Sequence, residues 1–160
     1  MNAAYFHIVS VHLPVILTPL GALLLIVAHL RTSATVARVA LGILVAAALL
    51  AIPVFLLGEP AEEIVEHLPG ISEDIIEAHE EAAEVGLWVS IASGLMSLIT
   101  WRLIATGAYL ERIFLTLTFL TATAASAALG YTAHQGGKIR HPEAFQNPPA
   151  EAKEHSEDDH

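Results

Sequence analysis

Residues 58–86, GEPAEEIVEHLPGISEDIIEAHEEAAEVG, form a strongly acidic stretch of the chain, and long apolar runs lie on both sides of it. This stretch carries ten Asp and Glu residues, no Lys or Arg, and two of the nine histidines, His67 and His79. The whole chain is 54% hydrophobic and only 15% charged, with a mean hydropathy of +0.59. Soluble domains carry roughly a quarter charged residues, so the composition indicates a membrane protein in which residues 58–86 contain the one sizeable loop.

Four apolar runs are each close to the ~20 residues that a helix needs to cross the hydrocarbon core of a bilayer. They cover about residues 8–30, 36–57, 85–105 and 113–133. Because two of the three connectors are very short, we expect sequential helices to be antiparallel. The sequence therefore predicts an all-α fold, an integral membrane up-down four-helix bundle formed by residues 1–141. Residues 142–160 are predicted to be an acidic, disordered tail.

The loop between the second and third spans is predicted to contain a short amphipathic helix that lies on the membrane surface. Apolar residues recur there at helical spacing after Pro60, at positions Ala61, Ile64, Val65 and Leu68. Arginines flank the first and third connectors, at Arg31, Arg38, Arg102 and Arg112. By the positive-inside rule, those two connectors face the cytoplasm. Both termini and the acidic loop are then predicted on the periplasmic side of the inner membrane.

The composition also narrows the classes of function. The chain has no cysteine, which excludes thiolate metal sites, iron–sulfur clusters and covalently attached c-type haem. The formal net charge is −10 and there is no basic stripe, so nucleic acid is not an expected partner. We find no nucleophile–base motif, and the chain is not expected to be an enzyme by itself. A role as a subunit of a membrane oxidoreductase stays open.

The predicted topology gathers histidines at one membrane face. His12 lies at the start of the first helix, His79 before the third span and His134 at the end of the fourth, while His67 lies in the loop. At 100° per residue, His79 shares a helix face with small residues such as Gly86. An ionisable residue inside a membrane span indicates a functional site by default. We therefore predict that His12, His79 and His134 converge and bind a cofactor.

Two cofactors suit such a cluster. Imidazoles from facing helices can hold haem b axially, which would make the protein an electron-transfer unit that exchanges electrons with quinone or a periplasmic redox protein. Alternatively, imidazole and carboxylate together suit iron, zinc or copper, as a redox or metal-handling site. The predicted metal ligands are His12, His67, His79, Glu80 and His134. His7, beside Tyr5, is most simply interpreted as an interface residue.

A different class of function is that of a structural subunit. In this reading the acidic loop docks a basic periplasmic partner within a larger membrane complex. Salt-sensitive partner binding, unaffected by loss of the histidines, would distinguish it from the cofactor hypothesis. Metal or proton transport is a weaker hypothesis, since no acidic path reaches the cytoplasmic half of the predicted bundle.

Four segments of the sequence together carry a family resemblance. They are His12-Leu13-Pro14, GEPAEEIVEHLPG from Gly58, HEEAA from His79, and GYTAHQGGKIRHPE from Gly130. With these segments, roughly residues 7–141 resemble the bacterial membrane family known as domain of unknown function 2231. The resemblance implies a four-span integral membrane protein. It also implies that His12, His67, His79, Glu80 and His134 are motif positions, and it implies no particular activity.

Overall fold

The computed structural model describes residues 2–67, 71–107, 111–141 and 144–145. The described helices are α1 Ala3–Ser10, α2 His12–Arg31, α3 Ala34–Leu56, α4 Gly58–Val65, α5 Glu73–Thr106 and α6 Glu111–Arg140. The predicted all-α fold is confirmed, since the described residues hold helices and no strand. The predicted tail at 142–160 lies outside the described residues, except for 144 and 145, and stays a prediction.

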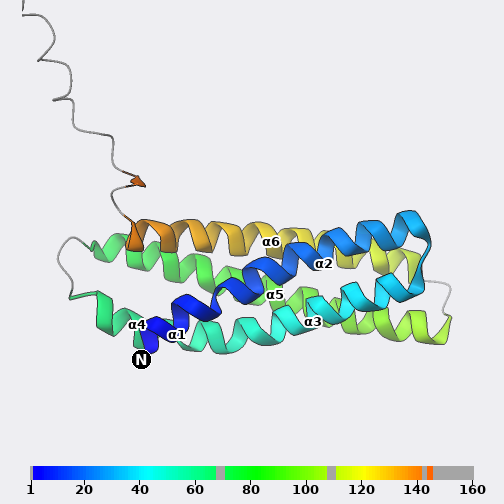
Figure 1. Cartoon of the computed structure of the whole chain (residues 1–160), viewed down its shortest axis with the longest axis horizontal. Coiled ribbons are helices and arrows are strands. Elements are labelled where there is room, and N and C mark those ends of the chain that lie inside the picture. The colour runs from blue at the N-terminus through cyan, green and yellow to red at the C-terminus, as the bar shows by residue number, and fades with distance from the viewer. Residues whose placement is uncertain (1, 68–70, 108–110, 142–143, 146–160) are drawn as a thin grey trace, which may run out of the picture.

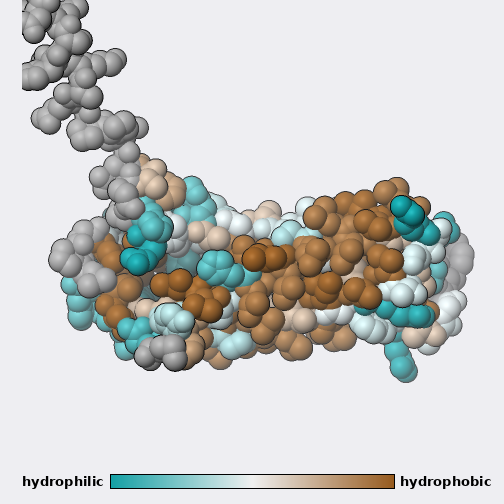
Figure 2. All heavy atoms as spheres, viewed as in Figure 1, coloured by the Kyte–Doolittle hydropathy of each residue, from teal (hydrophilic) through white to brown (hydrophobic). Residues whose placement is uncertain are grey.

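Four helical segments of the described chain are long and apolar enough to cross a membrane. They are Ala3–Arg31, Ala34–Val65, Glu73–Thr106 and Glu111–Arg140, and each contains one of the predicted spans. Large apolar side chains on them are exposed, with Leu23 at 60% and Leu49 at 63%. Figure 2 shows a broad apolar surface along the molecule, with most hydrophilic atoms toward its two ends. The protein is therefore a multi-pass membrane protein whose apolar surface suits lipid.

The four long segments lie side by side as a helix bundle (Figure 1). Helix α5 packs on α6 and α3, and α2 packs on α3 and α6. Helices α1 and α4, the start of α5 and the end of α6 lie at one end, which we call the histidine end for His7 and His79. The turn between α2 and α3 and the start of α6 lie at the other. We call it the arginine end, for Arg31, Arg38, Arg102 and Arg112.

Prolines follow the two places where the long segments are interrupted near the histidine end. The first interruption is at Val11, between α1 and α2, and Pro14 lies in the first turn of α2. The second is at Leu57, between α3 and α4, and Pro60 lies in the first turn of α4. A first turn tolerates proline, because its N–H groups have no intrahelical partner there. Helices α1 and α4 pack against each other beyond these interruptions.

The interior of the bundle is built on small side chains. Gly86, Ser90 and Ser97 of α5 are all buried, which confirms the predicted inward face of this helix. A Cβ atom added at Gly94 would lie 2.5 Å from the Cβ of Ala48 on α3. Helices α3 and α5 therefore approach so closely at this point that a hydrogen is the only side chain that fits. Small residues allow such an approach between membrane helices.

Candidate functional site

His79 is held against α6 by its ring. Its Nδ1 lies 3.0 Å from the backbone oxygen of Thr132, and a carbonyl oxygen can only accept a hydrogen bond. Nδ1 therefore donates its proton, and in the neutral ring Nε2 keeps a free lone pair. The ring lies directly over Gly136, where an added Cβ would come within 3.1 Å of its Cε1. A glycine at this position gives the imidazole room against the α6 backbone.

His7 is held in the same way by a different helix. Its Nδ1 lies 3.0 Å from the backbone oxygen of Val54, in the last turn of α3. The last four carbonyls of a helix lack intrahelical partners, so this oxygen is free to accept a proton from outside the helix. Nδ1 of His7 again donates, and Nε2 again keeps its lone pair. Two helix backbones thus fix the tautomer of two half-buried imidazoles.

The two imidazoles are neighbours. Their ring centroids lie 6.3 Å apart, with the ring planes at 88°. Histidines that bind metal ions almost always donate the other ring N–H to a carbonyl, a carboxylate or water, and both rings meet that condition. In a straight nitrogen–metal–nitrogen line, two bonds of about 2.0–2.1 Å each plus the two ring radii add up to about 6 Å, and a bent arrangement brings the ring centroids closer together. The spacing of His7 and His79 therefore leaves room for one ion when both Nε2 atoms are turned toward it.

The charge around the pair favours a cation. His79 precedes the apolar run that begins at Val85. Burial lowers the pKa of its imidazole, whereas its hydrogen bond to Thr132 and the charge of Glu80 act in the opposite direction. A lowered pKa favours the neutral ring, which is the form that binds a metal ion. Glu80 also hydrogen-bonds to Glu62 of α4. Glu62 lies in α4, and Glu80 lies in α5 directly after His79.

The carboxyl group of Glu62 holds its proton more tightly than a free glutamate does. The pKa of Glu62 is raised to about 7, chiefly by its hydrogen bond to Glu80, then by burial, and then by repulsion from Glu80, Glu66 and Glu59. Glu62 lies in α4, beyond the apolar run 36–57. Two carboxylates this close cannot both ionise without mutual repulsion. The histidine end therefore has groups that change charge near physiological pH.

The other predicted histidine ligands are exposed. His12 is exposed at the first position of α2, and His134 is exposed on α6, with its ring edge-on to Phe145 at a centroid distance of 5.3 Å. His67 is exposed and lies 3.5 Å from a carboxylate oxygen of Glu66. Among the described residues, no group of three or more His, Asp or Glu side chains is arranged to hold a metal ion. A ligand role for His12, His67 and His134 stays a prediction.

Sequence reasoning found His79 and missed His7. The face of His79 could be inferred because small residues recur at helical spacing after it, starting with Gly86. The partner of His7 is a backbone carbonyl of α3, and nothing in the pattern of α1 indicates that Val54 lies beside it.

Comparison with protein-family models, curated proteins and solved structures found no match to the chain. The resemblance to domain of unknown function 2231 therefore stays a prediction. The function has to be argued from the residues themselves.

Proposed function

We propose that the protein binds a transition-metal ion at the histidine end, through Nε2 of His7 and Nε2 of His79, and serves as a metal-handling or electron-transfer subunit of a membrane. The observation that carries the proposal is the pair of 3.0 Å hydrogen bonds from the two Nδ1 atoms to backbone carbonyls. These bonds orient both rings before any ligand arrives. The carboxyl pair Glu62–Glu80 adds negative charge nearby.

The proposal includes a topology. The helices run up and down through the inner membrane, and α4 lies on the membrane surface with Ala61 turned inward and Glu59 and Glu63 exposed. The histidine end faces the periplasm, which is supported by the four arginines at the opposite end. In this orientation the two imidazoles can exchange an ion or an electron with a periplasmic partner.

A single ion suits the pair better than haem b. Imidazole binds zinc, copper, iron and nickel, and two imidazoles leave coordination positions open for water or an external ligand. A haem would use the same Nε2 atoms as axial ligands. However, the haem ring needs open space on every side of the iron, and the imidazole of His79 is packed against the α6 backbone at Gly136.

The test uses asparagine, because its side-chain N–H can replace Nδ1–H of histidine without supplying Nε2. The full-length protein is purified in detergent, loaded separately with zinc and copper, and analysed for bound metal. We expect one ion per chain, lost in His7→Asn plus His79→Asn. The matched control, His12→Asn plus His134→Asn, changes two exposed histidines and should keep the ion.

Two results would overturn this assignment. If the control double variant loses the ion while His7→Asn plus His79→Asn keeps it, the ligands are the exposed histidines. If the wild-type protein binds no stoichiometric metal, the metal proposal fails. A visible spectrum with and without dithionite tests whether the cofactor is haem b. A Soret band that moves on reduction would show that the protein binds haem b instead of a single ion.

A second function is favoured by the exposed acids of the histidine end. Glu59 and Glu63 of α4 and Glu73, Glu77 and Glu81 of α5 are all exposed, and residues 58–86 carry no Lys or Arg. Such a surface suits a basic partner within a membrane complex. Binding of that kind would weaken with salt and would survive His7→Asn plus His79→Asn, whereas partner binding that requires the two imidazoles would argue against it.

A further inference from the structure

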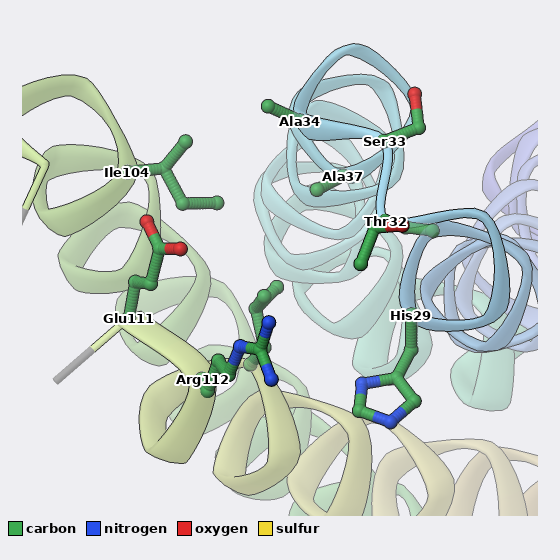
Figure 3. Close-up of a pocket in the computed structure, with 10 residues that line it drawn as sticks. His29, Thr32, Ser33, Ala34, Ala37, Ile104, Glu111 and Arg112 are labelled. Atoms are coloured by element: carbon green, nitrogen blue, oxygen red, sulfur yellow. The ribbon is translucent and has the colours of Figure 1, made fainter. Parts of the chain in front are cut away.

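A cavity of about 190 Å³ opens at the arginine end. It lies between the turn that joins α2 to α3 and the start of α6, and its apolar wall is formed by the buried residues Ala28, Ala37 and Ile104. Its rim is polar. Figure 3 shows Arg112 extending into the space between the start of α6 and Thr32, with His29 nearby. The cavity thus combines an apolar interior with a cationic mouth.

The electrostatic potential at this end is positive. Residues 29–38 and 101–112 carry four arginines and one acid, Glu111. Glu111 also lines the cavity. Within the described part of the chain, however, the ion pair is formed by His67 and Glu66, and Arg112 takes no part in it. The guanidinium of Arg112 therefore keeps its donors for another anion. Guanidinium groups bind phosphate through two parallel hydrogen bonds.

The size of the cavity limits the ligand. Sites for drug-sized molecules enclose about 300–1,000 Å³, so this space suits a small anionic group rather than a whole organic cofactor. Large apolar side chains are exposed in the same turns as the polar rim: Leu30 is 75% exposed and Ile113 is 55% exposed. A ligand here meets charge at one point and an apolar surface next to it. That combination matches an amphiphile.

We propose that this cavity binds the phosphate of an anionic phospholipid, with the guanidinium of Arg112 and the imidazole of His29 donating to the phosphate oxygens. The hydroxyl of Thr32 lies on the same rim and completes the set of donors. The acyl chains lie over the apolar surface beside Leu30 and Ile113. Cationic pockets between membrane helices bind anionic headgroups by the same chemistry. The inference does not depend on a metal at the histidine end.

The test compares lipid binding by the full-length protein in nanodiscs. The probe is dioleoyl phosphatidylglycerol in a phosphatidylcholine background, measured by native mass spectrometry or by competition with a labelled lipid in 150 mM salt, which screens diffuse attraction. We expect one preferred phosphatidylglycerol per chain. Arg112→Gln should weaken it about tenfold, because a charge-assisted hydrogen-bonded pair is lost. His29→Gln should weaken it less.

The matched control is Arg38→Gln, which removes the same charge from an exposed site at the same end but outside the cavity. Diffuse attraction accounts for at most about fivefold per basic residue, so the control should lose less than Arg112→Gln. Equal losses in both variants, or no preference for phosphatidylglycerol over phosphatidylcholine, would overturn the proposal. Saturation by inorganic phosphate with the same dependence on Arg112 would assign the site to a soluble anion instead of a lipid.

Discussion

The two ends of the bundle differ in how firmly their histidine and arginine side chains are held. At the histidine end, the rings of His7 and His79 are half-buried, and each is tied to a helix backbone by a 3.0 Å hydrogen bond. At the arginine end, Arg112 and His29 are exposed around an open cavity. Fixed rings suit an ion that demands defined geometry, whereas exposed cations at an open rim suit a headgroup that varies in shape. The contrast shows how one small bundle can support two kinds of binding.

Both ends of the bundle are connected through the same tightly packed middle. Gly94→Ala should have the largest effect on the whole molecule, because the new Cβ would lie 2.5 Å from the Cβ of Ala48. Overpacking of a filled core costs about 1–3 kcal/mol, against about 0.5–1 kcal/mol that alanine gains over glycine in a helix. We expect lower unfolding stability in detergent and weaker ligand binding at both ends. Unchanged stability would show that α3 and α5 are looser at Gly94.

A change confined to the histidine end separates the two regions. Gly136→Ala places a Cβ 3.1 Å from Cε1 of His79, which should push the ring away from its hydrogen bond to Thr132. Loss of an outer-shell contact typically lowers metal affinity by about 10–100-fold, and we expect about tenfold here, measured by competition with a chelating dye. Lipid binding at the arginine end should be unchanged.

Gly130→Ala is the matched control for that experiment. Gly130 lies on the same helix, and a Cβ added there would meet no atom within 4 Å. This variant should keep full metal affinity and gain slight stability from helix propensity. If both glycine variants lose metal affinity equally, the position of the His79 ring does not control the site.

The smallest effect is a pH dependence that only the histidine end should show. The folded-state pKa of Glu62 is raised from about 4.5 to about 7, first by its hydrogen bond to Glu80. Because the folded protein holds this proton more tightly than the unfolded chain does, the stabilisation is fully present below about pH 4.5 and is lost as the pH rises through about 7. Glu62→Gln keeps a neutral hydrogen-bond donor at this position. It should therefore flatten the pH dependence of the unfolding midpoint between about pH 5 and about pH 8.

Glu63→Gln provides the control, since it removes a carboxylate from the exposed neighbouring position of the same helix. It should leave the pH profile of the wild type intact. A wild-type profile that is already flat across this range would show that the pKa of Glu62 is not raised in the folded protein.

Helix content and membrane spans could be predicted from the sequence, because apolar runs of span length have few other solutions. The inward face of His79 could also be predicted, since Gly86 and Ser90 follow it at helical spacing. Small residues also precede His134 on α6, at Thr123 and Ala127, yet both are exposed. In lipid, small weakly polar residues are tolerated on the outer face as well, so residue size alone does not decide which face is buried.

The partner of His7 could not be predicted, because it depends on tertiary packing. The carbonyl of Val54 is free only because α3 ends a few residues later, and it meets His7 only because α1 turns at Val11 and packs beside α4. Backbone acceptors carry no sequence signature. A histidine that binds one therefore looks, in the sequence, like any other histidine at a helix end.

The ring of His79 rests on Gly136 of α6, which follows the other described helices in the chain. His7 belongs to α1, which precedes them. The pair therefore cannot take its final geometry before α6 has been synthesised, because the surface that seats His79 does not yet exist. A chain truncated before α6 would keep the Val54 carbonyl that holds His7 but would lack both the Thr132 carbonyl and the Gly136 backbone that hold His79.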